Sequence, residues 1–246
     1  MSASGAESRA RLAGSLKLCA NITLGRDRFA LTRLENSVMR QRAGLEQVAW
    51  VRPRALRRAV QQLDFGNVVT YADFSHHVCY TRDQPTIKFF DEILRQKRLY
   101  RETTLFRSVS RGRIRKKRIG LDKMSSVVLT PDNFVQYYDQ CMRHADFIIQ
   151  QGLKPFDKAL NHRPGRETDI AAVIDPSGEM MFFRRGNHRL GIARALGLER
   201  MPVRIYMLSG PYLERFMGRP ECWIPGRLPA RIQTATQAAL LATQPV

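Results

Sequence analysis

Residues 170–208 show the clearest hydrophobic pattern of this chain: continuous apolar runs, typical of buried strands, alternate there with a segment of helical spacing. Residues 170–175 and 179–184 each carry a short apolar run, and Pro176-Ser177-Gly178 between them is a strong turn signal. Directly after Gly186, residues 187–196 have apolar positions at helical spacing, and residues 201–208 return to a strand pattern. The pattern predicts a hairpin of two strands, a short helix that begins at a glycine, and a further strand.

Helical spacing also predicts three helices upstream of this unit. Pro53 opens one over residues 53–63, because proline suits the first turn of a helix, and residues 87–98 predict the next. Thr130 is the expected N-cap of a helix over residues 131–150, and Gly152 stands where a helix often ends. Residues 68–71 and 125–130 are rich in β-branched side chains and predict short strands.

The two ends of the chain lack a comparable pattern. Residues 1–44 are expected to be weakly structured, with one helix near residues 31–42 and a loose polar tail before it. Beyond Gly210, prolines at 211, 220, 225 and 229 interrupt the pattern, and the last residues are expected to fray. The chain is therefore divided into a basic, mostly helical region (1–120), a mixed domain (121–210) and a proline-rich tail (211–246).

The composition narrows the class of protein. Hydrophobic residues make up 43% of the chain, which permits an ordinary core and argues against global disorder. No apolar run approaches the roughly 18 residues of a membrane-spanning helix, and residues 1–28 lack the apolar leader of a secreted protein. The four cysteines, at 19, 79, 141 and 222, form no CxxC pair, so we expect reduced thiols and a cytoplasmic location.

One histidine pair is a candidate metal site. His76-His77 has Asp73 and Cys79 as its nearest ligand types, and this set would complete a zinc pair. We interpret the segment instead as an ordinary polar loop, so no metal site is predicted.

The net charge of +19 indicates an anionic partner, because such an excess of positive charge repels itself. Nucleic acid, anionic lipid and acidic glycan are the usual partners, and an arginine-rich genome is the alternative explanation. Tyr100 and Phe106 stand near the densest basic run, which favours contact with nucleic acid over a merely solvated loop. The polyanion-binding residues predicted in this run are Arg111, Arg113, Arg115, Lys116, Lys117 and Arg118.

The corner at Gly186 is the strongest candidate site. A helix N-terminus has free backbone N–H groups and partial positive charge, so a glycine for close approach and Arg189 for charge predict a phosphate site. The alternatives are a salt bridge from Arg189 to Asp175 or Glu179, and a structural role for His188 at the start of the helix.

Three stretches, in order, resemble the ParB/sulfiredoxin-like domain. Ile148-Ile149-Gln150-Gln151-Gly152-Leu153-Lys154-Pro155 is similar to the family's first box, a helix that ends in a Gly-Leu turn followed by proline. Gly186-Asn187-His188-Arg189 resembles the second box, and residues 195–203 resemble the stretch that closes the domain. The resemblance covers roughly residues 121–208.

The resemblance implies an α+β fold: a small mixed sheet with flanking helices, extended here by the basic N-terminal region. In that family the second box holds nucleotide phosphates. The resemblance thus implies a ligand that is a nucleoside triphosphate, ATP or CTP, with magnesium. Gly186, His188 and Arg189 would hold its phosphates, and Arg184 and Arg185 would add positive charge.

The departures from the family narrow the chemistry that the resemblance implies. Sulfiredoxins have a cysteine where this chain has Asn187, so reduction of a sulfinic acid lacks its thiolate nucleophile. The family's free-serine kinases carry an acidic residue where Arg185 stands. Its CTP-dependent DNA-segregation clamps add a helix-turn-helix, for which residues 211–246 are too short and too rich in proline.

These observations predict a nucleotide- or phosphate-binding protein, with NTP hydrolysis or phosphotransfer left open. One alternative is a non-enzymatic DNA- or RNA-binding protein, which the charge favours. The other is a kinase or ATPase that acts on a small metabolite, which requires a carboxylate near the phosphate site. Glu167 and Asp169 are the candidates for that general base or magnesium ligand.

Overall fold

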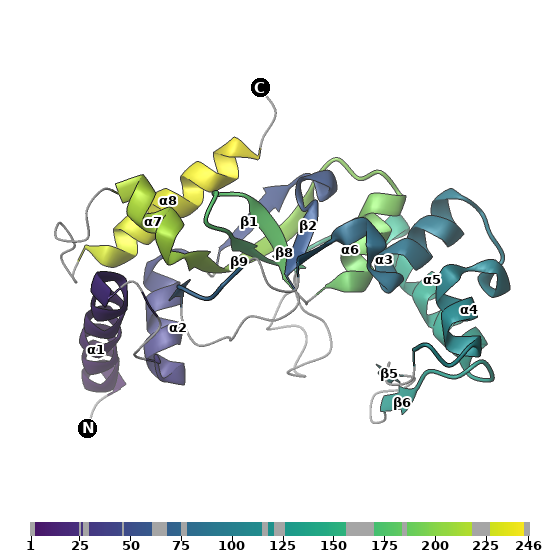
Figure 1. The fold of residues 1–246 in the computed structure, drawn as a ribbon, viewed down its shortest axis with the longest axis horizontal. Coiled ribbons are helices and arrows are strands. Elements are labelled where there is room, and N and C mark those ends of the chain that lie inside the picture. The colour runs from purple at the N-terminus through teal and green to yellow at the C-terminus, as the bar shows by residue number, and fades with distance from the viewer. Residues whose placement is uncertain are drawn as a thin grey trace.

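A mixed β-sheet lies at the centre of the protein, and a group of helices packs at each of its two ends (Figure 1). The computed structural model describes residues 3–24, 26, 30–45, 47–60, 68–74, 78–114, 118–120, 126–155, 170–183, 186–217 and 227–243. Within these residues, no helix is both long enough and apolar enough to cross a membrane.

The central sheet has seven strands in the described residues, in the order β1-β9-β7-β8-β2-β4, with β3 also paired to β9. The pairs β7–β9, β2–β8 and β3–β9 are parallel and the others antiparallel, which confirms a mixed α+β class. The strands are β1 (Val48–Val51), β2 (Arg58–Val60), β3 (Val69–Thr70), β4 (Val78–Tyr80), β7 (Ile170–Ile174), β8 (Met180–Phe183) and β9 (Met201–Ser209). Strands from before and after residue 120 therefore share one sheet.

The predicted unit of two strands, a helix and a further strand is confirmed. Strands β7 and β8 form the hairpin, α6 (Asn187–Ala195) follows, and α6 leads across β7 to β9 on its other side. Alternate residues of β7 enter different cores: Ala172 packs into the large cluster, whereas Ala171 and Val173 pack into a smaller one on the opposite face. Burial on both faces explains the continuous apolar runs in the sequence.

The helices at one end of the sheet surround α6. They are α3 (Pro85–Phe90), a π-helical turn (Asp91–Arg95), α4 (Thr104–Ser110) and α5 (Phe134–Gln151), so the helices predicted over 87–98 and 131–150 are present with shifted bounds. Buried Glu92, in the π-helical turn, accepts hydrogen bonds from the backbone N–H of Thr104 at 2.8 Å and from its hydroxyl at 2.6 Å. A small hairpin of β5 (Arg118–Gly120) and β6 (Ser126–Val128) completes this end.

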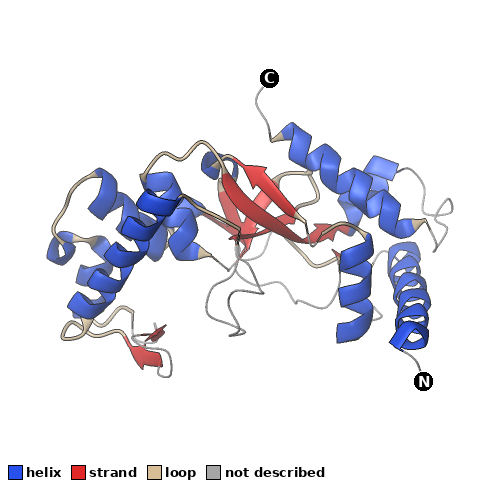
Figure 2. Cartoon of the chain, turned by 180° about the vertical axis from the view of Figure 1, so that it is seen from behind, coloured by secondary structure: helices blue, strands red, loops and turns tan. Residues whose placement is uncertain are grey.

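The helix expected near residues 31–42 is confirmed, but the loose polar tail expected before it was wrong. Helix α1 (Ala3–Leu24) packs against α2 (Arg33–Arg42) at the other end of the sheet, as Figure 2 shows from behind. The buried side of α1 combines Ala10, Gly14 and Ser15 with Leu18 and Ile22, whereas Leu12 and Leu16 are exposed. Apolar residues therefore lie on both faces of α1, and their pattern does not by itself mark the face that packs.

An ion pair fixes α1 to α2. Lys17 Nζ donates to both carboxylate oxygens of Glu35, at 3.0 and 2.8 Å, and Glu35 also accepts from the backbone N–H of Thr32 at 2.7 Å. Burial alone would raise the pKa of Glu35, but these hydrogen bonds outweigh it, so the pKa is lowered. The capping carboxylate of α2 is therefore also the contact that holds α1.

The prediction of a frayed C-terminal tail was also wrong. Helices α7 (Gly210–Met217) and α8 (Leu228–Ala242) pack beside α1 and α2 (Figure 1), and the Tyr212 hydroxyl on α7 donates to the Ala235 carbonyl on α8 at 3.0 Å. Pro211 and Pro229 stand in the first turns of these helices, where a proline does not interrupt the backbone hydrogen bonds. Pro220 and Pro225 lie outside the described residues.

The helix predicted over residues 53–63 is absent as well. A 3₁₀ turn, Pro53–Ala55, is followed by β2, in which Ala59 pairs with Phe182 of β8 and Cys79 of β4. Residues 61–63 lie outside the described part of the chain. The apolar positions of this segment fit a helix, but hydrogen-bonded pairing with β8 on one side and β4 on the other determines its conformation.

One edge of β9 has a gap that an arginine fills. Strand β1 pairs with residues 201–204 and β3 with residues 208–209, and the ladder between β7 and β9 skips Tyr206 as a bulge. The guanidinium of Arg40, on α2, donates to the Ile205 carbonyl at 3.0 Å and to the Tyr206 carbonyl, and lies 4.7 Å from the centre of the Tyr206 ring. Arg40 thus takes the place of strand residues and ties α2 to the sheet.

We predict that Arg40→Lys lowers the free energy of unfolding by about 1–3 kcal/mol, because an ammonium does not reproduce both donations of the guanidinium fork. The measurement is urea denaturation followed by circular dichroism. Arg42→Lys, at an exposed position of the same helix, is the matched control and should stay within about 0.5 kcal/mol of the wild-type chain. Equal effects of the two substitutions would contradict the assigned role.

Candidate functional site

Gly186 forms the corner between β8 and α6. Its backbone is left-handed, with φ +83° and ψ 24°, and a Cβ placed on it would lie 2.8 Å from the Cα of Ile170 at the start of β7. Both features require glycine, because L side chains disfavour this conformation and the neighbouring backbone leaves no room for a methyl group. The glycine predicted for close approach therefore makes that approach to a strand of the sheet.

The first turn of α6 begins at this corner. The Leu190 N–H donates to the Gly186 carbonyl at 2.8 Å, which makes Gly186 the N-cap of the helix. Asn187 and His188 are half-buried. The Oδ1 atom of Asn187 is buried and has no hydrogen-bond partner among the described residues, so the turn carries an unused polar atom.

His188 is held by aromatic side chains from two other helices. Its Nε2 lies 3.1 Å from the Tyr137 hydroxyl of α5, and its ring meets Phe90 of α3 edge-on at 5.8 Å. Burial raises the pKa of Tyr137 well above its usual value, so this hydroxyl stays protonated. The histidine ring therefore has a fixed orientation at the start of α6.

Arg189 links the two stretches that carry the family resemblance. Its side chain is largely buried and its Nη2 donates to the backbone carbonyl of Lys154, in the Gly152-Leu153-Lys154-Pro155 segment after α5. The carboxylates of Asp175 and Glu179 pair with Arg58 instead, at 2.9 Å in the case of Asp175. The hydrogen bond to Glu179 is the main reason that the pKa of Arg58 is raised.

Several residues predicted for this site lie outside the described residues, namely Arg184, Arg185, Glu167 and Asp169. Of the predicted basic run, Arg111 and Arg113 are exposed just after α4, and Arg118 begins β5. Arg115, Lys116 and Lys117 are not among the described residues. The structure thus brings together Gly186, Asn187, His188 and Arg189, and places Arg111 and Arg113 at the end of α4.

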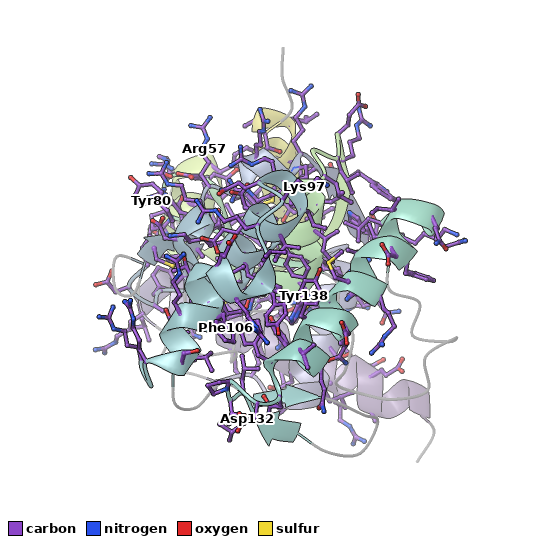
Figure 3. The ribbon with its side chains drawn as sticks, turned by 90° about the vertical axis from the view of Figure 1, so that its right-hand side faces the viewer. Arg57, Tyr80, Lys97, Phe106, Asp132 and Tyr138 are labelled. Carbon is purple, nitrogen blue, oxygen red and sulfur yellow. The ribbon has the colours of Figure 1, made fainter. Side chains whose placement is uncertain are left out.

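The aromatic residues near the basic run are packing residues. Tyr100 and Phe106 are half-buried, 5.7 Å apart, and both contact Phe134 of α5. Figure 3 shows Phe106 and Tyr138 between α4 and α5, and the ring of Tyr138 lies 5.4 Å from that of Tyr100. Tyr100 and Phe106 therefore pack against α5, and contact of these rings with nucleic acid stays a prediction.

A second concave region lies at the opposite end of α6 and was not predicted. It brings residues of the β1 corner, Trp50 to Arg54, against Arg194 and Arg200. The two groups are far apart in the sequence, so no local motif marks the region. The only sequence signal is that arginines stand close together in each of the two stretches, at 52, 54, 57 and 58 and at 194, 200 and 204.

Among the described residues, no group of three or more histidine, cysteine, aspartate or glutamate side chains is arranged to hold a metal ion. His76 and His77 lie outside these residues. Comparisons with protein-family models, with curated proteins and with solved structures found no match. The likeness to the ParB/sulfiredoxin-like domain therefore depends on the quoted residues and on the elements that carry them.

We predict that Gly186→Ala lowers the free energy of unfolding by about 3 kcal/mol or more, of which about 1–2 kcal/mol comes from the left-handed backbone and the rest from the clash with Ile170. Gly197→Ala is the matched control, because Gly197 has φ +67° but a Cβ placed on it would meet nothing within 4 Å. It should lose only about 1–2 kcal/mol. Equal losses in chemical denaturation would show that the close approach to β7 is unimportant.

Proposed function

We propose that this chain is a nucleotide- or phosphate-binding protein of the ParB/sulfiredoxin-like type, and that the first turn of α6 receives a phosphoryl group. The observation that carries the proposal is the left-handed Gly186 at the start of α6, because the N-terminus of a helix directs its backbone N–H groups toward a ligand. The helix dipole favours an anion at this position. The net charge of +19 supports a ligand of negative charge.

In this proposal the four residues of the second box have different roles. Gly186 provides the left-handed turn at which α6 begins. The backbone N–H groups of Asn187 and His188 would donate to the ligand, and Arg189 is a positioning residue. Its hydrogen bond to the Lys154 carbonyl holds the first box beside the second. This differs from direct, bidentate contact of Arg189 with phosphate, because the guanidinium already has a backbone partner.

The proposed ligand is a nucleoside triphosphate, ATP or CTP, with magnesium. Hydrolysis or transfer of the phosphoryl group requires a carboxylate to activate the nucleophile or to hold the metal. Asp169 directly precedes Ile170 in the sequence, and Ile170 contacts the Gly186 corner, so Asp169 is the first candidate to test and Glu167 the second.

We predict that Asn187→Asp weakens nucleotide binding by about tenfold or more, because it places a negative charge where the phosphate would lie. The same charge favours the N-terminus of a helix, so the free energy of unfolding should stay within about 1 kcal/mol of the wild-type value. The measurements are isothermal titration calorimetry with ATP, CTP, ADP and GTP, with and without magnesium, and urea denaturation.

Asn187→Ala is the control, since it removes the side chain without adding charge. It should bind nucleotide nearly as well as the wild-type chain if backbone N–H groups make the contact. A wild-type chain that binds none of these nucleotides, or an Asn187→Asp chain that binds them equally well, would refute the proposal.

A second function, binding of nucleic acid without catalysis, is favoured by the exposed arginines after α4. Arg111 and Arg113 are both exposed and continue along the chain into the basic run of the sequence. Arginines in such a run bind the phosphate backbone and release counterions, so the affinity depends steeply on salt. This function needs no nucleotide at α6.

For this second function, the double substitution Arg111→Ala and Arg113→Ala should weaken binding to plain duplex DNA. The slope of log K against log salt should become shallower by about 0.9 for each phosphate that is no longer neutralised. The double substitution Arg11→Ala and Arg42→Ala removes two exposed arginines at the other end of the sheet and serves as the charge-matched control. Identical slopes for the two double variants would show that the effect is one of net charge only.

A further inference from the structure

A cleft of about 380 Å³ lies at the C-terminal end of α6, away from the Gly186 corner. Residues 50–54 form one wall, where β1 ends and the 3₁₀ turn begins. The last residues of α6 and the turn after it form the other wall, and Thr243 at the end of α8 lines it too. Helix α6 has nine residues, so the cleft is about 13 Å along the helix from Gly186.

The lining of this cleft is strongly cationic. It contains Arg52, Arg54, Arg194 and Arg200 against the single carboxylate of Glu199. Arg52, Arg54 and Arg200 are exposed, whereas Arg194 is half-buried. Arginines from both walls therefore line one space.

Arg194 is held in place while it remains poorly neutralised. Its Nη1 donates to the Thr81 hydroxyl, which in turn donates to the Leu56 carbonyl at 2.8 Å. Burial lowers the pKa of Arg194, and the positive charges of Arg54 and Arg82 lower it further. The charged form is thus disfavoured by its surroundings, and an anion in the cleft would relieve that cost.

The acidic group that opposes this effect is Asp91, and Asp91 is already engaged. It accepts hydrogen bonds from Arg95 at 2.5 and 2.8 Å and from the Gln96 side chain at 2.7 Å. Arg194 therefore shares this carboxylate with another arginine. Clusters of this kind are suited to phosphate, because the guanidinium fork matches two phosphate oxygens at once.

We propose that this cleft binds a small, multiply charged phosphate ligand, a polyphosphate or a phosphate monoester, through Arg52, Arg54, Arg194 and Arg200. The volume exceeds that of a single water-sized ion and lies within the range of small-molecule sites. The site is separate from the one proposed at Gly186, so each can be tested without the other.

Trp50 offers a direct reporter for this site. It lines the cleft and is 46% exposed, and the chain has only one other tryptophan, Trp223. In a Trp223→Phe background, titration with inorganic tripolyphosphate at constant salt should give a saturable change in Trp50 fluorescence. Calorimetry with the wild-type chain provides the same binding curve if the Trp223→Phe chain fails to fold.

Arg54→Ala and Arg200→Ala should each raise the dissociation constant for tripolyphosphate by about tenfold or more, since each removes a charge-assisted hydrogen bond at an exposed position. Arg11→Ala, an exposed arginine on α1 and outside the cleft, is the matched control and should bind as the wild-type chain does. The Trp50 signal should respond equally in an Asn187→Asp chain, because Trp50 lines this cleft and not the start of α6; this separates the two sites.

Three outcomes would overturn the proposal. The first is the absence of saturable binding in both measurements. The second is binding that neither Arg54→Ala nor Arg200→Ala weakens. The third is binding of a short DNA duplex without binding of tripolyphosphate, which would make the cleft part of a nucleic-acid surface instead.

Discussion

The close approach of Gly186 to Ile170 determines where α6 begins, and the chemistry of the molecule is arranged along that helix. Its first turn presents Asn187 and His188 beside the end of the β7–β8 hairpin. Its middle is fixed by Gly191, where a Cβ would lie 2.8 Å from Phe90 of α3. Its last turn carries Arg194 into the cationic cleft. A shift of the corner by one residue would rotate all three parts together, because successive helical residues point about 100° apart.

Some of the arginines of this protein have a structural role. In the part of the chain that the structure describes, several arginine side chains donate to main-chain carbonyls or to carboxylates of another element, where a planar fork with several donors is better suited than an ammonium. They are Arg40, Arg58, Arg189 and Arg215. The net charge of +19 therefore overstates the charge left for a partner, and the exposed arginines at the cleft and after α4 are the better guide to binding.

The sequence is most informative where local pattern and tertiary structure agree. Strands β7, β8 and β9 and helix α6 are predictable, because strands buried on both faces are apolar throughout and Gly186 marks a necessary corner. Helix α1 is not, because its packing face combines small residues such as Gly14 and Ser15 with Leu18 and Ile22, whereas Leu12 and Leu16 are exposed. Residues 53–63 predict a helix because Leu56 and Ala59 have helical spacing, whereas pairing with β8 and β4 decides the conformation of β2. At the site, the position of Arg189 follows from the motif, but its carbonyl partner on a distant segment does not.

The way Arg40 covers the gap in β9 also bears on association between copies of the chain. A sheet edge with a row of unpaired N–H and C=O groups is a template on which a second chain can add a strand. Here β1 and β3 each cover part of β9, and the guanidinium occupies the carbonyls between them. Beyond β1 the chain continues into Arg52 and Pro53, and proline lacks the N–H that a ladder needs. Arg40, which anchors α2, therefore also blocks the addition of a strand from another chain at this edge of β9.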